Sequence, residues 1–129
     1  MVGGPQRDEV WLEVLDPTQG AEIQKTRPCL VISPDEMNQH LRTVIIAPMT
    51  TVTRPYPTRV AVRFQGKRGQ VALDQLGAVD RQRLVRMLGA VSAKTAQDVS
   101  ATMLEMFART LICLLAGRSG VRSARKNGL

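Results

Sequence analysis

The sequence predicts an α+β protein that is mainly β: a small antiparallel barrel with a C-terminal α-helix. Three observations predict this class. Short apolar runs, some alternating with polar residues, are separated by turns that contain Pro and Gly. The final apolar stretch instead has helical spacing. The length of 129 residues fits one domain, and with one Trp, one Tyr and two Phe its core must be aliphatic.

The first half of the chain predicts three strands. Residues 9–15 alternate between apolar and polar side chains, which is typical of a half-buried strand. A turn cluster then opens a loop that runs to Pro28. Residues 29–33 and 43–47 are short, β-branched apolar runs and predict buried strands, the second ending at Pro48. The connection between them carries His40, which is the only histidine.

The second half predicts further short strands. Two prolines within residues 49–57 exclude a central strand there, so this segment is predicted to be a structured loop. Residues 59–64 alternate strictly, with the valines and Phe64 facing inward. A turn at residues 66–69 follows. The remaining predicted elements are strands at 71–73 and 76–79, one helical turn at 80–85, and a last short strand at 88–91.

The C-terminal helix is predicted to begin at Ser92 or Thr95 and to end at Gly117. Its apolar stripe is wide for one small sheet to cover, which suggests a second copy of the chain, although packing on its own core is the commoner case. We therefore predict one domain over residues 1–116. Residues 117–129 are rich in Gly, Ser and Arg and are predicted to be a basic, disordered tail.

The net charge of +7 is unevenly distributed. Residues 1–36 carry three basic and seven acidic side chains. Residues 37–73 contain no Asp or Glu, and they carry the cations Arg42, Arg54, Arg59, Arg63, Lys67 and Arg68. Such a segment attracts a polyanion such as RNA or DNA, although a solvated basic face is an equally good interpretation of charge alone.

Several classes of protein and of site are excluded by composition. No apolar run is long enough to cross a bilayer, and the N-terminus lacks the apolar region of a signal peptide, so a cytoplasmic protein is expected. Cys29 and Cys113 are expected to be buried free thiols. A single histidine excludes a two-imidazole ribonuclease and a Cys/His zinc site. No phosphate-binding Gly-rich loop precedes a helix, and the acids are too scattered for two-metal catalysis.

The chemistry that remains uses arginine, carboxylates and hydroxyls without a metal or cofactor. Pro28 restricts Arg27 to an extended conformation, so this arginine is presented at the start of a strand by a rigid backbone. A guanidinium held in this way suits a phosphate, whereas the alternative is a surface arginine that only solubilises a loop. RNA permits such chemistry because it carries its own nucleophile, the 2′-hydroxyl.

A series of segments, in this order, resembles the MazF/PemK family of toxin endoribonucleases over about residues 8–116. The segments are 10–22 (VWLEVLDPTQGAE), 25–28 (KTRP), 33–38 (SPDEMN), 47–51 (APMTT), 54–58 (RPYPT), 73–75 (LDQ) and 79–84 (VDRQRL). The resemblance implies a homodimeric SH3-like barrel that cleaves single-stranded RNA, such as mRNA, without metal. It also implies a toxin–antitoxin system in which a MazE-like antitoxin places an acidic segment in the RNA groove.

The resemblance also assigns site residues. Arg27 matches the catalytic arginine of the family, Thr51 its catalytic threonine, and Glu22 the loop glutamate proposed as general base. Asp74 is a rival base, since some relatives use an aspartate from this later region. Arg27 would stabilise the phosphorane, and Thr51 would donate a hydrogen bond to a phosphate oxygen. The expected RNA contacts are Lys25, Thr50, Arg54, Asp74 and Gln75.

The expected reaction leaves a 2′,3′-cyclic phosphate and a 5′-hydroxyl. Two alternatives remain. One is a non-catalytic nucleic-acid-binding module of the same fold, which would bind RNA or DNA in a salt-sensitive way without cleavage. The other is a CcdB-like gyrase poison, which relies on a Trp near its C-terminus, whereas the only Trp here is Trp11.

Overall fold

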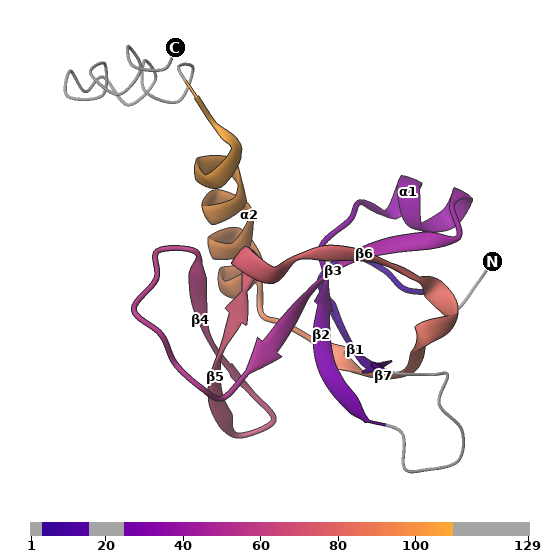
Figure 1. The fold of residues 1–129 in the computed structure, drawn as a ribbon, viewed down its shortest axis with the longest axis horizontal. Helices are drawn as coiled ribbons and strands as arrows, with labels where there is room; N and C mark the ends of the chain where they lie inside the picture. The colour runs from indigo at the N-terminus through magenta and orange to yellow at the C-terminus, as the bar shows by residue number, and fades with distance from the viewer. Residues whose placement is uncertain (1–3, 16–24, 110–129) are drawn as a thin grey trace.

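The structure of the protein is a computed structural model that describes residues 4–15 and 25–109. Seven antiparallel strands and two α-helices lie within them (Figure 1). In chain order the elements are β1 (Glu9–Val14), β2 (Thr26–Val31), α1 (Asp35–His40), β3 (Thr43–Thr50), β4 (Arg59–Phe64), β5 (Lys67–Ala72), a 3-10 turn (Leu73–Gln75), β6 (Gly77–Asp80), a second 3-10 turn (Arg81–Arg83), β7 (Leu84–Ala90) and α2 (Ala93–Phe107).

The sheet is organised around β3, which pairs with three other strands. The order is β4-β5-β3-β2-β1-β7, and β6 pairs with the first half of β3. β3 pairs with β2 as far as Pro48 and with β5 from Met49 onward, so the β4–β5 hairpin is a separate arm of the sheet. Figure 1 shows α2 beside this arm, and α2 contacts β4. The predicted class, mainly β and antiparallel with one C-terminal helix, is confirmed.

Two apolar clusters cover opposite faces of β1, β2 and β3. One contains Leu30, Ala47 and Val99 together with the inward residues of β4 and β5; the other contains Cys29, Val31, Ile46 and Leu84. Neighbouring residues of a strand face opposite sides, so a strand that is covered on both faces must be apolar at every position. This explains the continuous apolar runs of β2 and β3. Each fully buried Val, Leu or Ile side chain contributes about 1.5–3 kcal/mol.

Several element boundaries differ from the predictions. Pro48 does not end β3, because it lies where the strand changes partner from β2 to β5, a position that tolerates the missing N–H. The β4–β5 turn consists of Gln65 and Gly66 alone, both with positive φ, as in a type I′ hairpin. β7 begins at Leu84, earlier than predicted, because it pairs along the length of β1.

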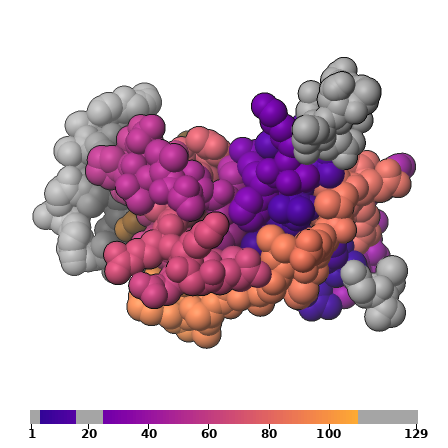
Figure 2. Space-filling model, turned by 90° about the horizontal axis from the view of Figure 1, so that it is seen from below, coloured from indigo at the N-terminus to yellow at the C-terminus, as the bar shows by residue number. Residues whose placement is uncertain are grey.

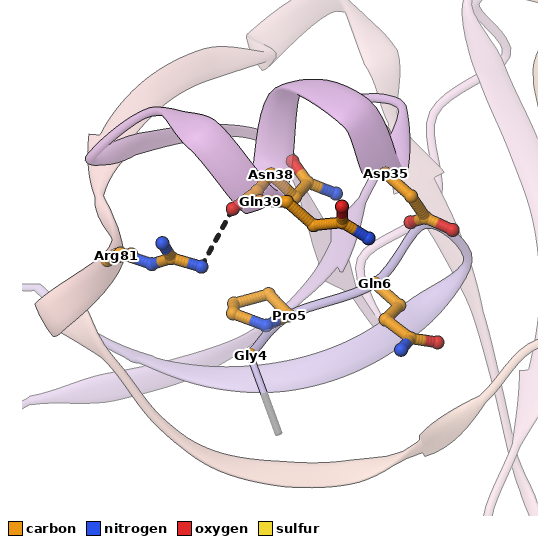
Figure 3. A pocket seen from close by; sticks show the side chains of 7 residues that line it. All are labelled: Gly4, Pro5, Gln6, Asp35, Asn38, Gln39 and Arg81. Atoms are coloured by element: carbon orange, nitrogen blue, oxygen red, sulfur yellow. Dashed lines mark hydrogen bonds between the residues drawn. The ribbon is translucent and has the colours of Figure 1, made fainter. Parts of the chain in front are cut away.

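Helix α1 was expected to be a plain connection. It is held by buried polar groups: the Ser33 hydroxyl donates to Asn38, and the Asn38 amide donates to the Ser33 carbonyl at 3.0 Å. Arg81 donates to the carbonyl of Asn38 at 2.8 Å (Figure 3). It also donates to the carbonyl of Leu41 at 3.3 Å, directly after the helix. The adjoining cavity has a volume of only about 30 Å³, enough for about one water molecule.

Of the two predicted caps of helix α2, the structure uses Ser92 and not Thr95: the Ser92 hydroxyl accepts a hydrogen bond from the Thr95 N–H at 3.2 Å. Asp98 pairs with Lys94 at 2.9 Å. Leu104 and Phe107 are exposed. The prediction that this helix continues to Gly117 is wrong: α2 ends at Phe107, because the backbone of Ala108 is extended. Cys113 and the predicted tail lie outside the described residues. No helix among residues 4–15 and 25–109 is long and apolar enough to cross a membrane.

Candidate active site

Arg27 lies in β2, directly opposite Glu13 of β1. The Arg27 Nε is 3.4 Å from the Glu13 Oε1. The Glu13 side chain is only 3% exposed, whereas that of Arg27 is 39% exposed. Among the described residues this is the only hydrogen bond of the Arg27 side chain. The guanidinium is therefore anchored at Nε by a buried carboxylate, while part of it remains open to solvent.

The end of β3 places Thr50 on the face of the sheet that carries Arg27. Cys29 pairs with Pro48, and side chains alternate along each strand, so Arg27 and Thr50 project from the same face of the sheet. Met49 packs in the opposite cluster, which is consistent with this alternation. The Thr50 Oγ1 accepts a hydrogen bond from the Val52 N–H at 3.0 Å, which leaves its own O–H available to donate. Thr51 is exposed and follows directly after β3.

Strand β5 fixes the backbone of this segment. A Cβ on Gly69 would lie 2.5 Å from the carbonyl oxygen of Thr50, so only glycine allows this approach. The Gln70 side chain brackets Arg54: its Oε1 accepts from the Arg54 N–H at 3.0 Å, and its Nε2 donates to the Arg54 carbonyl at 3.1 Å. The segment from Thr50 to Arg54 is therefore held at both ends by β5.

The Asp74 carboxylate is occupied by neighbouring side chains. Arg59 donates to both of its oxygens, at 2.8 and 3.3 Å, and the Thr58 hydroxyl donates at 3.1 Å. Arg59 also lies over the ring of Tyr56, 5.1 Å from its centroid. The hydrogen bonds from Arg59 lower the pKa of Asp74 below its usual value of 3.8. Asp74 is thus a weaker base than an ordinary aspartate.

A groove of about 440 Å³ runs beside the threonine pair. Its lining is apolar at Met49, Val62, Phe64 and Leu88, and polar at Thr50, Thr51, Gln65, Lys67 and Arg68; Pro28 and Gly69 complete it. It lies between the β4–β5 arm and the body formed by β2 and β7. Figure 2 shows the pink residues of the arm adjoining the indigo and purple body. The groove therefore combines apolar surface with cationic residues.

The other predicted site residues are distributed as follows. Lys25 is exposed, and its carbonyl accepts from the Leu15 N–H at 2.8 Å, which joins the two described ends of the first loop. Glu22 lies in that loop and outside the described residues. Arg54 and Gln75 are exposed. The strand register therefore places Arg27 and Thr50 on one face of the sheet, Thr51 follows directly after β3, and Asp74 is paired with Arg59.

The described residues at this site include a protonated thiol and no cluster of metal ligands. Burial, with a further contribution from Glu13, raises the pKa of the Cys29 thiol to about 12, so it stays protonated. The described part of the chain contains no group of three or more His, Cys, Asp or Glu side chains that could hold a metal ion.

Glu13 is not among the site residues predicted from the sequence. Glu13 alternates with apolar residues in a half-buried strand, a pattern typical of an acid that faces solvent. Its burial depends on two neighbours, Arg27 on β2 and Leu84 on β7. The pairing of β1 with β2 is the signal that could have identified Glu13, because it places this acid directly opposite the candidate catalytic arginine.

Comparison with known proteins identifies the family of this chain. Residues 6–107 match the family described as PemK-like, MazF-like toxin of type II toxin-antitoxin system. The chain belongs to this family. Endoribonuclease toxin MazF of Escherichia coli (strain K12) is 30% identical over 95 residues, which cover 73% of this chain and 85% of that protein. The prediction of a MazF/PemK toxin is therefore confirmed.

Other relatives of the family agree. Endoribonuclease PemK of Escherichia coli is 44% identical over 46 residues, although this match covers only 36% of the chain and 35% of that protein. An endoribonuclease from a mycobacterial species, solved in complex with its cognate antitoxin, superimposes with a TM-score of 0.66 at 25% identity. That match covers 79% of this chain and 93% of the solved one, so the shared fold includes nearly the whole relative.

Proposed function

We propose that this protein is a metal-independent endoribonuclease toxin that cleaves single-stranded RNA, including mRNA, at short sequences. The observation that carries the proposal is Arg27. Its guanidinium is anchored by Glu13 and partly open to solvent, on the face of the sheet that also presents Thr50. Membership of a family whose relatives are named endoribonucleases supports the same activity.

In the proposed reaction the 2′-hydroxyl oxygen of the RNA attacks the adjacent phosphorus. A base takes the 2′-hydroxyl proton, the bond from phosphorus to the 5′-oxygen breaks, and that oxygen takes a proton from solvent. The products are a 2′,3′-cyclic phosphate and a 5′-hydroxyl. Arg27 neutralises the charge that develops on the phosphorane, and it does so as a fixed cation rather than as a proton donor. A threonine hydroxyl donates to a non-bridging oxygen.

Either threonine of the pair could supply this hydroxyl. Thr51 matches the catalytic position by resemblance, and Thr50 shares the face of Arg27. We propose Glu22 as the general base in preference to Asp74, because Arg59 occupies both oxygens of Asp74 and lowers its pKa. Lys25, Arg54 and Gln75 are exposed and remain the proposed RNA contacts.

The proposed partners follow from the family. A MazE-like antitoxin would neutralise the toxin, as the antitoxin complex of the mycobacterial endoribonuclease suggests. We also propose a homodimer, since Leu104 and Phe107 leave apolar surface of α2 exposed among the described residues. The mRNA substrate places the protein in the cytoplasm.

The test is incubation of the purified protein with several single-stranded RNAs in EDTA, followed by mapping of the cleaved ends. Specific cuts with 5′-hydroxyl ends are expected, and Arg27→Ala should abolish them. Intact RNA, or equal cleavage by Arg27→Ala, would contradict the proposal. Intact RNA together with tight, salt-sensitive binding would instead identify a non-catalytic binding module.

A further inference from the structure

Glu13 is a carboxylate in an unusual position for a half-buried strand. It is 3% exposed and lies between Arg27 on β2 and Leu84 on β7. Burying a carboxylate costs several kcal/mol unless a cation and hydrogen bonds compensate. Among the described residues, Arg27 forms its only salt bridge. An apolar pair of similar size at these two positions would not carry this desolvation cost.

The contact uses the guanidinium in a specific way. The carboxylate meets Nε, the atom nearest the strand, so it restricts rotation of the guanidinium plane and leaves the two terminal nitrogens for another anion. At 3.4 Å the contact is long for a charge-assisted hydrogen bond. The contact therefore orients the guanidinium at Nε. Among the described residues, Glu13 forms no second hydrogen bond with a terminal nitrogen of Arg27.

The surroundings keep this arrangement rigid. Cys29 follows Arg27 on the same face of β2 and is fully buried, and Trp11 lies opposite Cys29 on β1. The next face neighbours, Val31 and Ile46, are also buried. Arg83 donates to the carbonyls of Val14 (3.1 Å) and Leu15 (2.6 Å) and so secures the end of β1 beside Glu13.

We propose that Glu13 is a positioning residue for RNA cleavage: it holds the Arg27 guanidinium so that its terminal nitrogens meet the phosphorane. This inference rests on the proposed endoribonuclease function and adds to it a residue that does not itself touch RNA. Mispositioning of a catalytic group by about 1 Å costs about 100-fold in rate. Loss of the buried anchor should therefore slow the chemical step more than it weakens RNA binding.

The experiment compares Glu13→Gln with wild type in the full-length protein, with Glu105→Gln as the matched control because Glu105 is an exposed glutamate on α2. Glu13→Gln is expected to lower kcat by about 10- to 100-fold. The Kd for a 2′-deoxy analogue of the cleaved RNA, which cannot react, should change by less than about threefold. Glu105→Gln should match wild type in both measurements. A wild-type kcat in Glu13→Gln, or a loss that appears wholly as weaker binding, overturns the proposal.

A second readout does not depend on cleavage. The Arg27 Nε–H resonance, assigned by its loss in Arg27→Lys, should shift in Glu13→Gln, because the charged acceptor is gone, and stay unchanged in Glu105→Gln. An unshifted resonance overturns the proposal. Should Glu13→Gln fail to fold, Glu13→Asp is measured in the same way; it keeps the charge but draws it back by one methylene, and an intermediate kcat is expected. If the wild-type protein does not cut RNA, the proposed function fails, while the resonance still decides whether Glu13 holds Arg27.

Discussion

Gly69 is where β5 passes closest to the threonine pair, so its replacement tests whether the position of that backbone matters. An alanine Cβ at Gly69 would lie 2.5 Å from the Thr50 oxygen and 3.3 Å from the Thr50 carbonyl carbon. Ordinary contact begins at 3.4 Å, so the backbone of Thr50 and Thr51 must move by about 0.9 Å or β5 must retreat equally. A displacement of that size corresponds to a rate loss of about 100-fold. Overpacking should also cost about 1–3 kcal/mol of unfolding free energy.

The assay is single-turnover cleavage of a saturating RNA by Gly69→Ala, with thermal unfolding measured on the same samples. Gly77→Ala is the matched control, because a Cβ on Gly77 meets nothing within 4 Å. Gly77→Ala should cut at close to the wild-type rate. Amide resonances of Thr50 and Thr51 should shift only in Gly69→Ala. If Gly69→Ala is folded and cuts as fast as Gly77→Ala, the position of the threonine backbone is not important for catalysis and this reasoning is refuted.

Three further predictions concern the same region. Separate Thr50→Ala and Thr51→Ala variants should identify the catalytic hydroxyl. Loss of one hydrogen bond made only in the transition state lowers kcat by about 100-fold or more. A wild-type rate in both variants would exclude a role for the pair. Since the folded-state pKa of Asp74 is depressed, its stabilising contact with Arg59 is present above its unfolded-state pKa and is lost as the pH falls through its folded value. The difference in Tm between wild type and Asp74→Asn should therefore shrink in unfolding scans below about pH 4. Finally, the Cys29 thiol has a pKa of about 12 and is buried, so it should resist iodoacetamide at pH 8 in the native protein and react on unfolding; rapid native-state alkylation would contradict its burial.

Strands could be predicted from the sequence where the burial of each residue follows from its position along the strand alone. The continuous apolar runs that became β2 and β3 and the strict alternation of β4 were identified correctly, because both patterns follow from which faces are covered. Pro48 shows the limit of this reasoning. A proline ends a strand when its N–H is needed, and whether it is needed depends on where β3 exchanges β2 for β5. Strand pairing over such distances has no local signature.

The candidate site also contains residues that could be predicted from the sequence and residues that could not. Arg27 could be found from the sequence, since Pro28 restricts its backbone and the surrounding segment resembles the family. The contacts of Glu13 and Asp74 could not be predicted, because each depends on a partner from another strand. Glu13 is buried by two neighbouring strands, and Asp74 is occupied by Arg59 of β4. Acids that look alike in a sequence can therefore differ in their surroundings: the side chain of Glu13 is 3% exposed, and that of Asp74 is 30% exposed.

The structure also refines the argument from charge. The acid-free segment at residues 37–73 supplies six cations, but two of them are paired with acids from later in the chain: Arg59 with Asp74 at 2.8 Å, and Arg42 more loosely with Asp80 at 3.9 Å. The other four cations of this segment, Arg54, Arg63, Lys67 and Arg68, form no salt bridge with any described residue. Lys67 and Arg68 line the groove beside the threonine pair. A polyanion is attracted by unpaired charge, because a paired cation has already lost most of its field to its partner. The β4–β5 arm and the loop before it, rather than the net charge of +7, therefore define the path that RNA is expected to follow past the threonine pair.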